Sequence, residues 1–358
     1  MKTKLVLSLV LATLLSGVSH LAHAQAGVVN STQNPRQIAI LYWYSANQTT
    51  SFPIPGIPRG FAFDGSNIWV GNGAGQGTVT KLRASDGACV GSCTFAVGGQ
   101  AEGGVAFDGA YIWIATLGNS VTKLRASDGA CNGIVNPPTV AACSFAVGSY
   151  PGALAFDGTY IWVANAGSNT ATKLRASDGA CNGVVNPPTV AACSFAVGTT
   201  PGAIAFDGVN IWVANNQSNS VSRLGTDGTL LQTFLGFSGP AGLAFDGVNL
   251  WVTNDNASGS VTKLSPQNGS WSNYTLTTYQ VGPNPMGIAF DGANVWVANG
   301  GGDSVTKLRA RDGACNGSVN PPNVSACTFR AGTTPFSVVF DGANIWVANE
   351  EGASISKL

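Results

Sequence analysis

One pattern of apolar and polar positions recurs seven times along the chain. A short apolar stretch ends in Phe-Asp-Gly. Two variable residues, an apolar-Trp-apolar triplet, a polar stretch and a segment ending in Lys-Leu or Arg-Leu follow. The Phe-Asp-Gly copies begin at Phe63, Phe107, Phe156, Phe206, Phe245, Phe290 and Phe340. Repeats of about 40 to 50 residues that contain several short strands are typical of β-propellers.

Each repeat predicts four strands. Strand a is short and apolar, as in 153–156, and strand b carries the tryptophan, as in 161–164. The Asp-Gly between them is a hairpin signal. Strand c is the Ser-Val-Thr-Lys-Leu type of segment, and strand d is the segment around Phe145. We therefore predict an all-β fold, a seven-bladed β-propeller of four-stranded blades.

The seventh repeat reaches Lys357-Leu358 and shows no strand d. Upstream of the first repeat, 51–56 matches strand d of blade 2 at 144–148, so we expect this N-terminal strand to complete blade 7 and to cover two sheet edges. Its prolines suit an outermost strand. The propeller is predicted over 46–358, and 25–45 is predicted as an N-terminal arm or linker. Within the arm, 38–44 is apolar and aromatic, which predicts an extra strand or a packed segment.

The first 24 residues read as a secretory signal peptide, with Lys2 and Lys4, an apolar run over 5–15 and Ala22-His23-Ala24 at the cleavage position. We therefore expect a secreted or periplasmic protein. Of 17 basic residues two are lysines of this segment, so the mature chain has 15 basic and 17 acidic residues, net −2. A chain so poor in positive charge is not expected to bind nucleic acid. The apolar run over 5–15 is too short for a membrane span. We expect the protein to be a monomer.

The eight cysteines fall into four pairs that each flank the loop between strands c and d of one blade. Eight cysteines allow 105 pairings, but the repeat favours local closure. Zinc is disfavoured because C-x-x-C pairs and histidine partners are missing. The predicted disulfides join Cys89 with Cys93, Cys131 with Cys143, Cys181 with Cys193, and Cys315 with Cys327.

Three side chains occur once per blade: the tryptophan, a strand-c cation and the Phe-Asp-Gly aspartate. A repeated indole predicts a wedge between neighbouring sheets, with a carbohydrate-stacking platform as the alternative. The cations could form an anion site, but equal numbers in every blade favour a structural role, each near a turn carboxylate. The cations are Lys81, Lys123, Lys173, Arg223, Lys263, Lys307 and Lys357.

Candidate function therefore lies where the blades differ, in the d–a and b–c loops that share one face of a propeller. These loops contain Arg59, Glu102, Tyr150, Asp255, Asp303, Glu350 and Glu351. Five of the seven are acidic and could gather as a site for Ca²⁺ or Mg²⁺, although ordinary solvated loop charges are the simpler interpretation. No cofactor is required by the sequence. Both histidines, His20 and His23, lie in the predicted signal peptide, which excludes Ser-His-Asp and Cys-His catalysis and histidine-ligated metals from the mature chain.

The repeat that spans Phe206 to Leu224 resembles YVTN-type and NHL-like bacterial propeller repeats, over roughly 50–358. The resemblance implies the propeller fold and an extracytoplasmic binding or scaffolding role. Streptogramin B lyases belong to the same superfamily; they are seven-bladed and open a cyclic depsipeptide with a histidine base, a carboxylate and Mg²⁺. This chain departs from them, because it has no mature histidine and its triplets continue as Trp-Val-Ala-Asn rather than Trp-Phe-Thr-Glu.

Three functions remain open at this point. The first is a non-catalytic module that binds a partner protein, a glycan or a small ligand on its d–a and b–c loop face. The second is a carboxylate- and divalent-cation-dependent enzyme, a lyase like the streptogramin lyases or a glycosidase. The third is a purely structural protein of the cell envelope.

Overall fold

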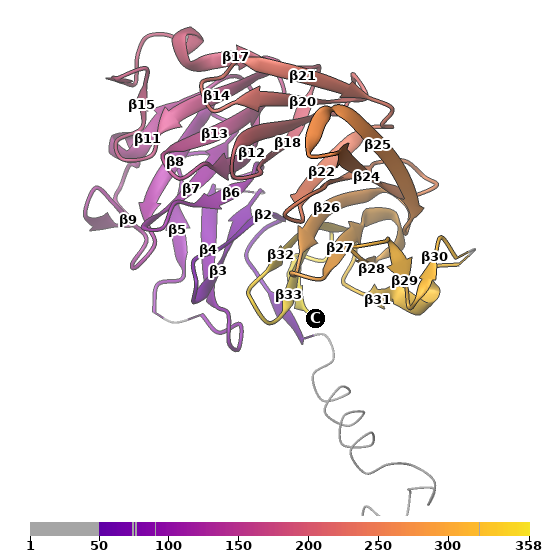
Figure 1. Ribbon diagram of the computed structural model, residues 1–358. Coiled ribbons are helices and arrows are strands. Elements are labelled where there is room, and N and C mark those ends of the chain that lie inside the picture. Colours follow the sequence, from indigo (N-terminus) through magenta and orange to yellow (C-terminus); the bar gives the residue numbers. More distant parts are fainter. Residues whose placement is uncertain (1–49, 74, 76, 90, 322) are drawn as a thin grey trace, which may run out of the picture. The chain divides into compact units, whose positions relative to one another are not determined.

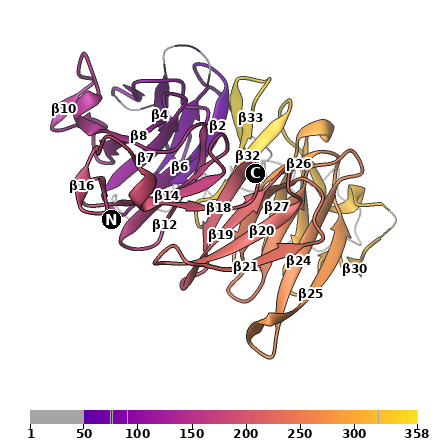
Figure 2. The same cartoon turned by 90° about the horizontal axis from the view of Figure 1, so that it is seen from above.

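The computed structural model describes residues 50–358 except residues 74, 76, 90 and 322. They form seven four-stranded antiparallel sheets that follow one another in chain order, from indigo to yellow in Figures 1 and 2. The predicted all-β, seven-bladed fold is confirmed. The expected signal peptide, the arm at 25–45 and the apolar segment 38–44 lie outside the described residues.

The strands of the first three blades run from the inner strand a to the outer strand d. Blade 1 contains β2 (Pro58–Phe63), β3 (Asn67–Asn72), β4 (Thr78–Arg83) and β5 (Thr94–Ala96). Blade 2 contains β6 (Val105–Phe107), β7 (Tyr111–Thr116), β8 (Ser120–Arg125) and β11 (Ser144–Ala146). Blade 3 contains β12 (Pro151–Phe156), β13 (Tyr160–Asn165), β14 (Thr170–Arg175) and β17 (Ser194–Ala196).

The remaining blades follow the same order. Blade 4 contains β18 (Pro201–Phe206), β19 (Asn210–Asn215), β20 (Ser220–Gly225) and β21 (Leu230–Leu235). Blade 5 contains β22 (Pro240–Phe245), β23 (Leu250–Asn254), β24 (Ser260–Gln267) and β25 (Ser270–Gln280). Blade 6 contains β26 (Pro285–Phe290), β27 (Asn294–Asn299), β28 (Ser304–Arg309) and β31 (Thr328–Arg330). Blade 7 contains β32 (Pro335–Phe340), β33 (Ile345–Asn349), β34 (Ser354–Lys357) and, as its outer strand, β1 (Thr50–Pro53).

Strand β1 pairs antiparallel with β34, with Ser51 opposite Ser356 and Phe52 opposite Ile355. The first and last described strands thus share one sheet. The ring of Phe52 packs on Trp346 with centroids 5.6 Å apart, as the strand-d phenylalanine does on the tryptophan in blades 1 to 4 and 6. The N-terminal strand therefore occupies the strand-d position in blade 7.

The Phe-Asp-Gly aspartate locks each a–b hairpin onto its tryptophan. In blade 3, Asp157 Oδ1 accepts hydrogen bonds from the backbone N–H groups of Thr159 and Tyr160, and Oδ2 accepts one from Trp162 Nε1 at 2.7 Å. The same bond from tryptophan Nε1 to the aspartate occurs in all seven blades, at 2.7–2.8 Å. Burial alone would raise the pKa of Asp291, but the hydrogen bonds from Trp296 and Asn294 outweigh it and lower that pKa.

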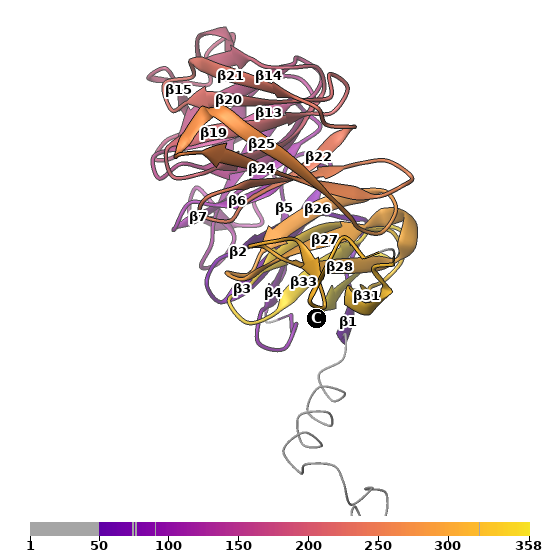
Figure 3. The same ribbon diagram turned by 45° about the vertical axis from the view of Figure 1, so that its right-hand side comes forward.

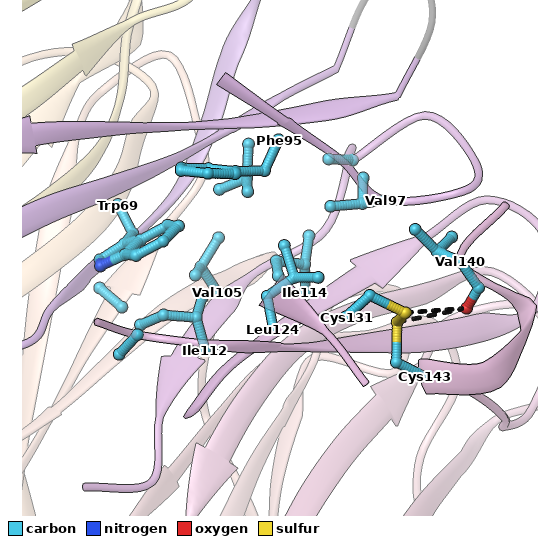
Figure 4. Packing of buried hydrophobic residues seen from close by; sticks show 14 residues of the cluster. Trp69, Phe95, Val97, Val105, Ile112, Ile114, Leu124, Cys131, Val140 and Cys143 are labelled. Carbon is cyan, nitrogen blue, oxygen red and sulfur yellow. Dashed lines mark hydrogen bonds between the residues drawn. A yellow bond between two sulfur atoms is a disulfide. The ribbon is translucent and has the colours of Figure 1, made fainter. Parts of the chain in front are cut away.

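Each tryptophan also fills the gap to the following blade, as predicted for a wedge between sheets. Trp69 of blade 1 packs in one cluster with Ile112, Ile114 and Leu124 of blade 2 (Figure 4). Trp113 of blade 2 makes the equivalent cluster with blade 3. Blade 4 is covered differently: the long β24–β25 ribbon of blade 5, visible in Figure 3, packs its Trp271 against Trp212, with ring centroids 4.6 Å apart.

The strand-c cation lies over the tryptophan ring of its own blade and reaches the next blade. Lys123 Nζ is 5.1 Å from the centroid of Trp113 and donates hydrogen bonds to the backbone carbonyls of Ala176 and Ser177. The hydrogen-bond acceptors are thus carbonyl oxygens of the next c–d turn, and the turn carboxylates of Asp108 and Asp178 act on Lys123 through their charge alone. Burial lowers the pKa of Lys123, and the charge of Asp108 opposes this shift.

All four predicted disulfides are confirmed, with Cα–Cα distances of 5.4–5.6 Å. In blades 2, 3 and 6 the disulfide holds a c–d loop that contains a short hairpin and a 3₁₀ turn, placed at the periphery in Figure 1. The hairpins are β9–β10 (Ala130–Cys131, Ile134–Val135), β15–β16 (Ala180–Cys181, Val184–Val185) and β29–β30 (Ala314–Cys315, Ser318–Val319). The 3₁₀ helices are Ala141–Cys143, Ala191–Cys193 and Ser325–Cys327, with a fourth at Gly300–Gly302 in the b–c loop of blade 6.

These cysteine loops cover the outer strand of the preceding blade. Asn136 accepts a hydrogen bond from the N–H of Ala96 at 3.2 Å and donates one to the carbonyl of Thr94 at 3.1 Å, so its amide pairs with the edge of β5. Asn186 makes the same two bonds to β11, and Asn320 donates to β25. The unpaired N–H and C=O groups of an exposed edge strand can pair with another chain. These asparagines form hydrogen bonds with some of those groups.

A second tie between neighbouring blades uses a left-handed residue in the b–c loop. Asn119, Asn169 and Asn219 have positive φ, and each side-chain oxygen accepts a backbone N–H from the following d–a loop. In blade 6 this position is Asp303, with φ 49°, and its Oδ1 accepts the N–H of Thr334 at 2.9 Å. Asn and Asp tolerate the left-handed region better than most residues and also supply the acceptor oxygen. Blades 1, 5 and 7 have Gly77, Gly259 and Ala353 at this position, also with positive φ, and these residues have no side-chain oxygen for the tie.

We expect Asp157→Ala to destabilise the fold by about 1–3 kcal/mol, because the indole N–H of Trp162 and two backbone N–H groups lose their acceptor. Urea unfolding followed by circular dichroism measures the change. Asp157→Asn keeps one acceptor oxygen and should lose less. Equal stability of wild type and Asp157→Ala would refute this account of the hairpin.

Asp303→Asn should leave the free energy of unfolding within about 0.5 kcal/mol of wild type, because asparagine restores the residue found in three other blades. Asp303→Ala should cost about 1 kcal/mol through the lost bond to Thr334. Both values come from the same urea titration. A loss for Asp303→Asn as large as that for Asp303→Ala would show that the negative charge itself is needed.

Among the four disulfides, Cys89–Cys93 should be reduced first under native conditions. Cys89 is exposed, whereas the other three disulfides join cysteines that are at most 5% exposed, and thiol exchange requires access to sulfur. Brief dithiothreitol treatment, alkylation and mass spectrometry should label Cys89 and Cys93 about tenfold faster than the other six. Equal labelling of all eight cysteines would contradict this order.

Candidate functional site

The seven inner strands surround a central cavity of about 380 Å³. In six blades strand a begins with a proline, and the residue after it lines the cavity: Arg59, Gly152, Gly202, Ala241, Met286 and Phe336. Blade 2 contributes the 102–105 segment. The large side chains Met286, Phe336 and Arg59 come from the consecutive blades 6, 7 and 1, whereas blades 3 to 5 present glycine or alanine. At this position of strand a the cavity therefore meets large side chains on one side and glycine or alanine on the other, where Leu154, Ile204 and Leu243 also line it.

Two glycines show how this wall is built. A Cβ at Gly60 would lie 2.7 Å from the backbone of Gly103, so neighbouring inner strands approach too closely there for any side chain. At Gly202 an ideal Cβ would have no atom within 4 Å. Gly202 thus faces open space, and the room in the cavity lies toward blades 3 and 4.

Arg59 is held in place from two directions. Its guanidinium makes a 2.8 Å ion pair with Glu350 Oε1 and lies over the ring of Phe336, 4.9 Å from the centroid. Both charged side chains are about three-quarters buried, at 24% and 22% exposure. The pair joins the inner strand of blade 1 to the b–c turn of blade 7, and it neutralises the positive charge at the mouth of the cavity.

Glu102 reaches the same cavity because the inner strand of blade 2 is irregular. Here β6 covers only Val105–Phe107, so Glu102 lies in the loop before it, where the other blades have the proline. The Cγ atoms of Glu102 and Arg59 both border Gly73, at 3.3 and 3.1 Å from the position of its Cβ. Within the described part of the chain Glu102 forms no ion pair, which leaves its carboxylate available to a ligand.

The other predicted site residues do not line this cavity. Tyr150 has positive φ and is 65% exposed at the surface. Asp255 accepts a hydrogen bond from Asn284 Nδ2 at 3.3 Å, and Asp303 serves the structural tie to Thr334. Glu351 is exposed in the turn after Glu350. Of the seven candidates, the structure therefore brings together three: Arg59, Glu102 and Glu350.

Two lining residues, Met286 and Phe336, were missed by the sequence analysis because they read as ordinary apolar positions of strand a. Comparing the residue after the proline across the blades would have found them, since that position is bulky in some blades and glycine or alanine in others. The sequence signal for these two residues is the size of the side chain rather than its charge.

Across 50–358, apart from the four undescribed positions, no three histidine, cysteine or carboxylate side chains are grouped so that they could hold a metal ion. In the same part of the chain no helix has the length and apolar character needed to cross a membrane. The Ca²⁺ or Mg²⁺ site remains a prediction for which these residues offer no carboxylate cluster.

No protein-family model and no curated protein matches this chain. Among solved structures it is similar to a catalytically inactive histidine-to-alanine variant of virginiamycin B lyase from Staphylococcus aureus with quinupristin, with TM-score 0.61, 16% identity, and coverage of 87% of this chain and 98% of the lyase. A streptogramin B lyase structure gives TM-score 0.62, 17% identity and 86% and 96% coverage. A proposed 6-phosphogluconolactonase from Bacteroides fragilis gives TM-score 0.60 and 17% identity, with coverage of 80% of this chain and 85% of the other protein. The resemblance to streptogramin lyase-like propellers is thus confirmed for the fold, and these identities extend it no further.

Proposed function

We propose that this protein is an exported, non-catalytic binding module that takes a small ligand, or a small protruding part of a larger partner, into the mouth of its central cavity. The observation that carries the proposal is the asymmetry of the inner ring. Arg59, Phe336 and Met286 form one wall, and Gly152, Gly202 and Ala241 leave the opposite side open.

The dimensions and chemistry of the cavity support ligand binding. Its volume of about 380 Å³ falls within the range of small-molecule sites, about 300–1,000 Å³. Such sites combine apolar walls with a few fixed polar groups. Here Phe336 and Met286 supply apolar contact, the Arg59–Glu350 pair supplies an immobilised polar edge, and Glu102 supplies an unpaired carboxylate.

The same residues argue against the enzymatic alternative. The lyase variant that this fold resembles is inactive with a histidine replaced by alanine, and the only histidines of this chain are His20 and His23, in the predicted signal peptide. Glycoside hydrolysis by carboxylates ordinarily needs two of them at the reacting bond. Among the described residues Glu102 lines the cavity without an ion-pair partner, whereas Glu350 does not line it and is paired with Arg59. Binding without turnover is the function that fits these groups.

Export is the second part of the proposal. Four disulfides agree with an oxidising compartment, because cytosolic proteins seldom keep structural disulfides. The signal-peptide pattern of the first 24 residues points in the same direction.

Filling the cavity from Gly202 should abolish binding and leave the fold intact. A phenylalanine there points into open space, because no atom lies within 4 Å of the Cβ position. We expect fragments found by ligand-observed NMR on the mature protein to lose their signal with Gly202→Phe. Val248→Phe, which adds the same ring at a residue that is 61% exposed, is the matched control and should bind as wild type does.

Two results would contradict this proposal. One is a set of fragments that bind Gly202→Phe as well as wild type, since they would occupy another place. The other is turnover: if the mature protein linearises quinupristin, followed by mass spectrometry with and without Mg²⁺, the module is an enzyme.

A further inference from the structure

Five of the seven strand-c cations are fixed by backbone carbonyls of the following blade. The lysine Nζ atoms donate at 2.5–3.0 Å to one or two carbonyl oxygens of the next c–d turn. The five are Lys81, Lys123, Lys173, Lys263 and Lys357. Their ammonium groups are occupied by the fold.

Two cations, Arg223 of blade 4 and Lys307 of blade 6, donate no such bond to the described residues, and of these Lys307 borders a pocket. Its Nζ keeps the place over the ring of Trp296, 4.7 Å from the centroid, but it makes no hydrogen bond to the described residues of blade 7. The outer strand of blade 7 is β1, so the c–d turn that supplies the acceptors elsewhere has no counterpart in the described residues. The uncovered place is also visible in the packing, because Trp296 is 9% exposed whereas the other six blade tryptophans are 0% exposed.

A pocket of about 290 Å³ opens beside Lys307. It is lined by Lys307, Arg309, Asn294, Asn316 and the cysteine loop around Cys327 and Phe329, all from blade 6. The lining contains cations and amide groups and no carboxylate. It lies at the a–b and c–d end of the blade, whereas Arg59 lies at the d–a and b–c end, so this pocket is separate from the central cavity.

Blade 3 offers the same pocket with a different charge. There the volume is about 310 Å³, and Lys173 and Arg175 take the places of Lys307 and Arg309. However, Lys173 Nζ donates to the carbonyl of Thr226 at 2.5 Å, and Asp227 of the next blade joins the lining. The ammonium in the blade 3 pocket is therefore engaged and neutralised from blade 4, and that in the blade 6 pocket is not.

The blade 6 pocket contains one cation without a carboxylate partner among the described residues, the ammonium of Lys307. Arg309 is engaged by Asp312 through two hydrogen bonds of 2.8 and 2.7 Å, and this bonding lowers the pKa of Asp312. The single ammonium of Lys307, fixed by its indole, suits a monoanion better than a dianion. The ring of Phe329, which lines the pocket and packs on Trp296 with centroids 5.5 Å apart, offers apolar contact to the rest of such a ligand.

We propose that this blade 6 pocket is an anion site that takes the carboxylate of an organic acid with an apolar or aromatic body. The carboxylate accepts hydrogen bonds from Lys307 Nζ, in the place that carbonyl oxygens hold in five other blades, and from the side-chain amide of Asn316. The amide of Asn294 already donates to Asp291. Such charge-assisted hydrogen bonds are stronger than neutral ones. This site is independent of the proposed function at the central cavity.

Isothermal titration of the mature protein with benzoate tests the site. We expect one benzoate per chain and no binding of benzamide, the uncharged analogue of the same shape. Lys307→Gln should weaken benzoate binding about tenfold or more, because it removes the charge. Lys173→Gln is the matched control: it removes the equivalent lysine of blade 3, whose ammonium already has an acceptor, and should leave benzoate affinity unchanged.

Several outcomes would overturn the proposal: equal losses in Lys307→Gln and Lys173→Gln, unchanged affinity in Lys307→Gln, or several equivalent benzoates per chain. Tighter binding of inorganic phosphate than of benzoate would overturn the assignment to a monoanion. Circular dichroism of both variants excludes unfolding as the cause of a loss.

Amine labelling gives a readout that needs no variant. With limiting acetic anhydride and mass spectrometry, Lys307 should acetylate faster than Lys123 and Lys263, which are 8% exposed and hydrogen-bonded. Benzoate should slow the labelling of Lys307 and of no other strand-c lysine. Labelling of Lys307 that is no faster than that of Lys123, or that benzoate does not change, would contradict the site.

Discussion

The structure depends on one repeated contact, a buried indole fixed on three sides. In each blade the Phe-Asp-Gly aspartate accepts the indole N–H, the strand-c cation lies over the ring, and the following blade packs on the indole. A tryptophan buries a large apolar area, but its N–H must find an acceptor. The aspartate meets that need within the hairpin that carries the tryptophan. The indole N–H is thus satisfied within its own blade, while the apolar face of the ring remains free to pack on the next blade. A ring of equal sheets requires both.

Because the repeated indole, aspartate and lysine contacts occupy one another's polar groups, we look for chemistry where a blade departs from the repeat. Blade 2 replaces the strand-a proline with Glu102 and so places a carboxylate at the cavity. Blades 6, 7 and 1 replace a small inner residue with Met286, Phe336 and Arg59. Blade 6 keeps its cation, but the described residues of blade 7 present no carbonyl acceptor to it. The two proposed sites are therefore two consequences of the same broken symmetry, one at each end of the blades.

The sequence predicted the fold, the blade count and the disulfide pairing because each depends on residue type at a fixed spacing. It failed where the partner is a backbone atom or an empty space. The carbonyls that bind Lys123 belong to Ala176 and Ser177, whose side chains carry no hint of the role. Asp303 stood out as a charge, yet its position requires positive φ and an acceptor, and asparagine fills the same position in three blades. Arg59 and Glu350 were both singled out, but only the folded chain shows that they neutralise each other.

The Arg59–Glu350 pair also links ring closure to the cavity. Arg59 stands on the first inner strand, β2, and Glu350 follows β33 in the last blade, so the pair spans the junction at which β1 completes the sheet of β34. An exposed ion pair contributes little, but this one is three-quarters buried and stacked on Phe336 of the same last blade. Opening the junction would remove both partners of Arg59 at once. The wall of the cavity and the closure of the ring are therefore coupled, and a ligand that packs on Phe336 and Arg59 stabilises the closed ring by mass action.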